Sequence, residues 1–128
     1  MSNFLDFLSR IFISSIFLLS GYNKIFNYNE TISWMEEFGV SGFLLAPAII
    51  LEIILPLLII VGYKTKIAAT LLALFCIATG VIFHLDFSDQ MQTIQLLKNF
   101  GLAGGFLLIA VNGPKEWALE AKKKYVRL

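Results

Sequence analysis

The chain alternates between long apolar stretches and polar links, and four of the stretches are long enough to cross a bilayer. An α-helix rises about 1.5 Å per residue, so roughly 20 apolar residues span the ~30 Å hydrocarbon core. The pattern predicts membrane-spanning helices over residues 4–25, 43–61, 67–85 and 94–111. All links but the first are short, which makes consecutive helices antiparallel neighbours. We therefore predict an all-α, integral membrane four-helix bundle, with a single domain over residues 1–128.

The first link, residues 26–42, contains a predicted short helix of its own. Asn29 is a suitable N-cap, and Gly39 follows Phe38 as a helix terminator. Trp34 suits a helix at the membrane interface, where tryptophan is enriched. The same residues also fit a helix that packs as a cap over the end of the bundle, and the pattern leaves both alternatives open.

Composition supports a membrane protein and argues against several other classes. Of the 128 residues, 58% are hydrophobic and only 15% are charged, against about 25% in soluble domains. The net charge of +1 provides no basic groove for nucleic acid. The single cysteine, Cys76, cannot form an internal disulfide. The lone histidine, His84, cannot by itself supply a metal site or a pair of haem ligands.

Charge is distributed unevenly between the links, and this predicts the orientation of the chain. The second link and the C-terminal tail carry the basic residues Lys64, Lys66, Lys115, Lys122, Lys123, Lys124 and Arg127. The first and third links carry the acidic residues Glu30, Glu36, Glu37, Asp86 and Asp89. Because basic links stay inside, we expect both termini to be cytoplasmic. The basic amphipathic tail, residues 114–128, fits either contact with anionic lipid through Trp117 and Tyr125 or a solvated tail.

Glu52 lies near the middle of an almost wholly apolar stretch. A carboxylate near the bilayer midplane costs roughly 2.5–3.5 kcal/mol on insertion scales, so it marks a functional site or a structural ion pair. Pro56 lacks the N–H that would bond to the carbonyl of Glu52. The sequence leaves two arrangements open. Glu52 pairs with Arg10 and fixes two helices in register, or it forms the floor of a pocket beneath Lys98 and His84.

Polar residues also recur at helical spacing along the other predicted spans. One face of the first span carries Arg10, Ser14, Phe17, Gly21 and Lys24. Three further polar residues lie at a membrane depth similar to that of Lys24, and these are His84, Lys98 and Asn99. The spacing Gly101-x-x-x-Gly105 lets another helix approach the fourth span closely. The candidate ligand-binding residues are Arg10, Lys24, Glu52, His84, Lys98 and Asn99.

A set of short motifs occurs in a fixed order along nearly the whole chain. They are Arg10, Gly21-Tyr-Asn-Lys24, Glu52, Gly62-Tyr-Lys-Thr-Lys66, His84 and Lys98-Asn99-x-Gly101-x-x-Gly104-Gly105. In order and spacing they resemble the DoxX family of small four-helix bacterial and archaeal inner-membrane proteins. The resemblance implies a multi-pass inner-membrane protein. It also implies an association with thiosulfate:quinone oxidoreduction, or with thiol-redox and superoxide-detoxifying partners.

Two functions fit these observations better than a third, transport of a small solute along a polar path through Glu52, for which four short helices are poorly suited unless they oligomerise. The first is a redox-associated subunit that binds a quinone or a small anion in a polar intramembrane site, since His84, Lys98 and Asn99 can donate hydrogen bonds to such a ligand. The alternative is a non-catalytic accessory subunit of a larger membrane complex. The sequence contains no self-contained catalytic or redox centre, so we expect no intrinsic cofactor beyond a bound quinone. The expected partners are the lipid bilayer and either other membrane subunits or further copies of the chain.

Overall fold

The computed structural model describes residues 1–120, and all regular secondary structure in this part of the chain is helical. The elements are α1 Ser2–Phe26, α2 Tyr28–Glu37, the 3₁₀ turn η1 Gly42–Leu44, α3 Leu45–Val61, α4 Thr65–Phe83 and α5 Gln90–Asn112. Four segments are long and apolar enough to cross a membrane: α1, η1 together with α3, α4, and α5. This confirms the predicted all-α fold with four spanning segments.

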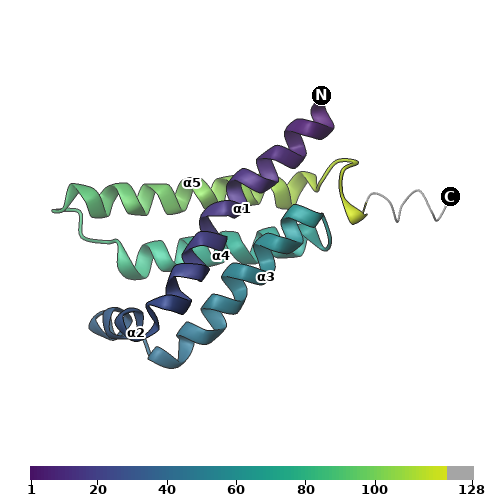
Figure 1. Ribbon diagram of the computed structural model, residues 1–128. Coiled ribbons are helices and arrows are strands. Elements are labelled where there is room, and N and C mark those ends of the chain that lie inside the picture. Colours follow the sequence, from purple (N-terminus) through teal and green to yellow (C-terminus); the bar gives the residue numbers. More distant parts are fainter. Residues whose placement is uncertain (121–128) are drawn as a thin grey trace.

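The four long helices pack as two antiparallel pairs (Figure 1). α1 packs against α3 and α4 packs against α5, while α3 and α4 join the two pairs. α2 lies at one end of the bundle, beside the beginning of α3 (Figure 1). The beginning of α1 and the segment after α5 meet at the opposite end, where Asn3 donates a hydrogen bond to Glu116.

Capping side chains place some helix ends differently from the apolar pattern. α5 begins at Gln90 rather than residue 94, because the Asp89 side chain accepts a backbone N–H of the first turn. α2 confirms the short helix predicted in the first link, but Asn29 lies inside it and is not its N-cap. The cap position is Asn27, whose side chain makes no capping hydrogen bond.

Helical spacing determines which faces are buried. α1 buries Arg10, Ser14, Phe17 and Gly21, the face predicted from the sequence. The main core joins this face to α3, α4 and α5 through Ile59, Leu72, Cys76 and Phe106, with small alanines on α4.

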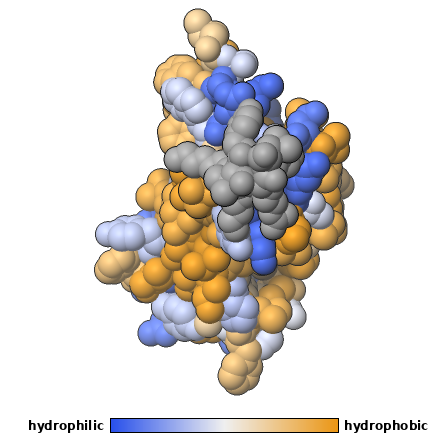
Figure 2. Space-filling model, turned by 90° about the vertical axis from the view of Figure 1, so that its right-hand side faces the viewer, coloured by the Kyte–Doolittle hydropathy of each residue, from blue (hydrophilic) through white to orange (hydrophobic). Residues whose placement is uncertain are grey.

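Large apolar side chains cover the outer faces, among them Phe12, Leu19, Ile50, Leu74 and Leu108. Figure 2 shows the molecule from the right-hand side of Figure 1, where broad hydrophobic areas lie beside hydrophilic groups.

The glycines of α5 meet two different environments. A Cβ atom at Gly105 would lie 2.6 Å from the side chain of Ile13, so this glycine allows α1 to approach. A Cβ atom at Gly101 or Gly104 would meet no atom of the described residues within 4 Å. The predicted close packing therefore occurs at Gly105, whereas Gly101 and Gly104 lie on the outer face of the helix.

Arg10 holds together the end of the bundle that lies away from α2. Its side chain is 1% exposed and donates to Asp6 Oδ2 at 3.0 Å. It also donates to the carbonyls of Ile59 at 2.9 Å, of Ile60 at 2.7 Å, and of Trp117. Carbonyls in the last turn of a helix lack intrahelical partners, so Arg10 caps the end of α3 with its positive charge.

Residues 113–120 fold back over the same end. The backbone N–H of Glu120 donates to the carbonyl of Gly62 at 3.0 Å, and its carboxylate accepts a backbone N–H at the beginning of α4. The Trp117 ring packs edge-on against two phenylalanines of α1. This first part of the predicted amphipathic tail therefore contacts the bundle directly. The rest of the tail, including Tyr125, lies outside the described residues.

Candidate functional site

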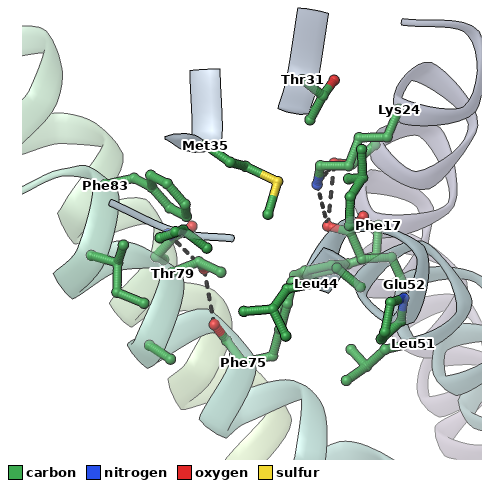
Figure 3. A pocket seen from close by; sticks show the side chains of 18 of the residues that line it. Phe17, Lys24, Thr31, Met35, Leu44, Leu51, Glu52, Phe75, Thr79 and Phe83 are labelled. Carbon is green, nitrogen blue, oxygen red and sulfur yellow. Dashed lines mark hydrogen bonds and ion pairs between the residues drawn. The ribbon is translucent and has the colours of Figure 1, made fainter. Parts of the chain in front are cut away.

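A cavity of about 470 Å³ lies between the two helix pairs, at the end of the bundle that α2 covers (Figure 3). Its walls are mainly apolar, and its volume falls within the range of about 300–1,000 Å³ that is typical of small-molecule sites. The polar lining residues are Ser20, Lys24, Thr31, Glu52, Thr79, His84 and Asn99. The cavity therefore combines an apolar interior with a few hydrogen-bonding groups.

The ion pair between Lys24 and Glu52 forms one wall (Figure 3). Lys24 Nζ lies 2.6 Å from Glu52 Oε1 and also donates to Ser20 Oγ at 3.1 Å. α3 approaches α1 closely here, since a Cβ atom at Gly21 would lie 2.9 Å from the side chain of Ile53. The pocket alternative is thus correct in placing Glu52 at a cavity. The predicted pairing of Glu52 with Arg10 is wrong, because Glu52 forms its ion pair with Lys24 instead.

The link from α4 to α5 positions His84 at the cavity. His84 directly follows α4, and its Nδ1 lies 2.6 Å from Gln92 Oε1 in the first turn of α5. This hydrogen bond ties the link to the first turn of α5 and holds the His84 ring in place. Farther along the link, Ser88 donates its hydroxyl and its backbone N–H to Asp86. These two hydrogen bonds hold the pKa of the Asp86 carboxyl below its ordinary value.

α2 forms the roof of the cavity through Thr31, Trp34 and Met35. The Trp34 ring stacks on Phe83 of α4, with the ring centroids 4.5 Å apart and the planes at 22°. Phe38 packs edge-on against both rings, at 5.2 Å from Trp34 and 5.1 Å from Phe83. These contacts favour the alternative in which the helix of the first link is a cap over the bundle.

The structure brings together four of the six candidate ligand-binding residues. The four that line the cavity are Lys24, Glu52, His84 and Asn99. Arg10 lies at the opposite end of the bundle, and Lys98 is exposed on α5. The sequence interpretation missed Ser20 and Thr79. Ser20 was recognisable in principle, because it precedes Lys24 by one helical turn.

The arrangement can bind a ligand but contains no metal centre within residues 1–120, since no three His, Cys, Asp or Glu side chains cluster there. An ammonium group has three N–H donors, and Lys24 uses two of them on Glu52 and Ser20. The third remains for a ligand oxygen. On the other wall, the Asn99 side chain makes only a long hydrogen bond of 3.5 Å to Thr79 within residues 1–120, and it can bind a ligand as well.

Comparisons with known proteins agree with this architecture. The pattern of the DoxX family matches residues 5–85. Inner membrane protein YqjF of Escherichia coli (strain K12) is 35% identical over 112 residues, which cover 88% of this chain and 86% of that protein. Inner membrane protein YphA of the same organism is 30% identical over 122 residues, covering 90% of this chain and 87% of that protein. No match to a solved structure reaches significance. With four helices able to span a membrane, the chain is a multi-pass inner-membrane protein and belongs to the DoxX family.

Proposed function

We propose that this protein is a redox-associated membrane subunit that binds a quinone in the cavity between its two helix pairs. The observation that carries the proposal is the arrangement of polar groups on two facing walls of an otherwise apolar cavity. A quinone head is a flat ring with carbonyl oxygens at opposite edges. It requires an apolar slot and a hydrogen-bond donor near each oxygen.

The two walls supply donors of this kind. Lys24 retains one N–H beyond those used on Glu52 and Ser20. Asn99 supplies an amide group, whose hydrogen bond to Thr79 is long at 3.5 Å. The stacked aromatic rings of Trp34 and Phe83 also line the cavity. A ring bound here gains favourable contacts with these aromatic side chains in addition to apolar burial.

A small anion, the other predicted ligand, receives less support. The positive charge of Lys24 is already balanced by Glu52 at 2.6 Å. Lys98, the other cation expected at the site, does not line the cavity. Transfer of an uncompensated anion into apolar surroundings is costly, so this lining favours a neutral ligand.

Quinone content and a cavity-filling variant test the proposal. Ala48 lines the cavity, whereas Ala46 lies on the same helix, is exposed and does not. We expect the purified protein to carry quinone in near-equal molar amount and to gain thermal stability from added quinone. Ala48→Trp should lose both properties, and Ala46→Trp should keep them. Reproducible absence of quinone, with no effect of added quinone on stability, would refute the proposal.

The outer face of α5 favours a second candidate, a non-catalytic accessory subunit of a larger complex. Gly101 and Gly104 leave a flat surface there, and Lys98 is exposed one turn away without an ion pair among residues 1–120. Small residues let membrane helices approach closely. We expect purification in mild detergent to recover the same large partner each time, and Gly101→Leu to lose it. A homo-oligomer alone would contradict this candidate.

A further inference from the structure

Only one oxygen of the Glu52 carboxyl group is satisfied. Oε1 accepts from Lys24 at 2.6 Å and from Ser20 at 3.4 Å. Oε2 is buried and has no hydrogen-bond partner among the described residues. A buried polar atom without a partner destabilises the folded protein, and more so when it is charged. A hydrogen bond from a ligand, or a proton on the carboxyl group, removes this cost.

The two redox forms of a quinone differ in what they require from Glu52. The carbonyl oxygens of the oxidised quinone only accept hydrogen bonds, so a carboxyl group beside one of them must be protonated in order to donate. The hydroxyls of the reduced quinol donate, and they match an ionised carboxylate. Exchange of one form for the other at Glu52 therefore changes the proton content of the site by one.

Glu52 is the group best placed for this change. Lys24 of α1 faces Glu52, but the Lys24 ammonium group already donates a hydrogen bond to Glu52 Oε1. On α4, Cys76 is buried and does not line the cavity, whereas His84, which directly follows that helix, does line it. The contribution of α5 to the lining is uncharged Asn99 and Leu102, and that of α2 is uncharged Thr31, Trp34 and Met35.

A second hollow lies on the outside of α1 and shares lining residues with the cavity. It is a groove of about 360 Å³ lined by Ile16, Leu19, Ser20, Asn23, Lys24, Asn27 and Thr31. Ile16, Ser20, Lys24 and Thr31 line both the groove and the cavity, while Asn23 and Asn27 are exposed near the end of the span. Ser20 accepts from Lys24 and donates to Glu52, so hydrogen bonds lead from the groove to the carboxyl group.

We infer that Glu52 takes up one proton when an oxidised quinone binds, that it stays ionised when the quinol binds, and that the groove beside Ser20 and Lys24 supplies the proton. No electron moves in this step: the proton adds to a Glu52 oxygen and is then shared with a quinone oxygen. The inference rests on the proposed quinone site and adds the proton-exchanging residue and its route to water.

Isothermal titration calorimetry in buffers of different ionisation heat counts the protons. With a short-chain benzoquinone, we expect the wild-type protein to take up about one proton per ligand bound, and with the corresponding quinol, under anaerobic conditions, about none. Glu52→Gln should bind the quinone without proton uptake, because its amide donates directly. Glu37→Gln, on the exposed face of α2, is the matched control and should behave as the wild type.

Each result decides between the claims. If neither ligand form binds, the proposed function is wrong. If the quinone binds without proton uptake, or if Glu52→Gln still takes up a proton, the quinone site stands and the inference about Glu52 is wrong. Should Glu52→Gln fail to fold, the wild-type protein still provides a test, because linkage requires quinone affinity to fall as pH rises while quinol affinity does not.

Stopped-flow measurement with a pH indicator tests the route. Asn23 is exposed in the groove and its side chain makes no hydrogen bond among the described residues, so Asn23→Leu removes one polar group from the groove with little other effect. We expect it to slow proton uptake several-fold without changing the number of protons. Asn29→Leu, exposed on α2 outside the groove, should leave the rate unchanged. An unchanged rate in Asn23→Leu would overturn the groove as the route.

Discussion

Lys24 reaches from the last turn of α1 to Glu52 in the middle of α3, and its Nζ lies 2.6 Å from Glu52 Oε1. The Glu52 side chain is 3% exposed and that of Lys24 is 26% exposed. Lys24→Met leaves a buried carboxylate without its cation, and we expect it to lower the free energy of unfolding by about 3 kcal/mol. Denaturation of the purified protein in detergent measures the effect.

The double variant Lys24→Met/Glu52→Leu separates charge from packing. Replacement of both members of a buried ion pair by apolar residues is often neutral or stabilising. We therefore expect the double variant to regain most of the lost stability, although it should lose quinone binding. A double variant as unstable as Lys24→Met would mean that packing of the lysine stem, rather than its charge, stabilises this wall.

Arg10 should prove to be a structural residue. Arg10→Gln removes the charge that caps α3 and leaves Asp6 without its ion-pair partner, so we expect a loss of about 3 kcal/mol in stability. The segment after α5 should also loosen, because Asp6 accepts the backbone N–H of Lys115 and Arg10 holds the carbonyl of Trp117. Faster tryptic cleavage after Lys115, followed by mass spectrometry, reports this change.

Quinone affinity provides the control for Arg10→Gln. Arg10 does not line the cavity, so the folded fraction of the variant should bind quinone as the wild type does. Reduced affinity in material shown to be folded would return Arg10 to the set of ligand-binding residues.

Gly62→Ala should destabilise the protein through its backbone. Gly62 has φ of +75°, a conformation that costs other residues about 1–3 kcal/mol. A Cβ atom there would also lie 2.7 Å from Cα of Ala118, in the segment that folds back over the bundle. We expect thermal unfolding in detergent to show a loss of at least this size.

Gly101→Ala is the matched substitution on the outer face of α5. A Cβ atom at this position meets nothing within 4 Å among the described residues, and alanine is favoured over glycine inside a helix by about 1 kcal/mol. We therefore expect equal or higher stability in the isolated protein. Equal losses from Gly62→Ala and Gly101→Ala would contradict the distinction drawn here between the two glycines.

Trp34→Ala should weaken quinone binding by about tenfold, because it removes a ring that lines the roof of the cavity and stacks on Phe83 at 4.5 Å. Phe38 touches both rings but does not line the cavity. Phe38→Ala should therefore cost stability while affinity stays near that of the wild type. Calorimetric titration with a short-chain benzoquinone measures both variants, and equal affinities in the two would exclude Trp34 as a ligand contact.

The sequence predicted the features that depend on periodicity and on membrane thickness. Each span must fill the hydrocarbon core, so its apolar length revealed it. The buried face of α1 followed from helical spacing, which placed Arg10 and Lys24 on the same side. That same spacing could not identify the partner of Glu52. Arg10 and Lys24 lie roughly 21 Å apart along one face, and the register of α3 against it depends on packing between nearly uniform apolar surfaces.

The other features that the sequence analysis missed or placed wrongly also depend on tertiary contacts. The acceptors of Arg10 at the end of α3 are main-chain carbonyls, which have no signature in the sequence. The roof of the cavity depends on contact between Trp34 and Phe83, which come from separate helices. The outward position of Lys98 depends on how α5 is rotated about its axis against α4, and Gly80 lets Asn99 approach α4 closely in that arrangement.

The orientation of the chain across the membrane is the last prediction. The charge distribution predicts that α2 lies on the side of the membrane away from the cytoplasm, and that the segment after α5 lies on the cytoplasmic side. Cys76 is 1% exposed, so the natural thiol should remain unlabelled and single cysteines can be introduced at exposed positions. We expect Ser33→Cys on α2 to react with a membrane-impermeant maleimide in intact spheroplasts, and Lys115→Cys to react only after permeabilisation. The reverse pattern would place the cavity and its groove on the cytoplasmic side, and proton uptake by Glu52 would then draw on the cytoplasm.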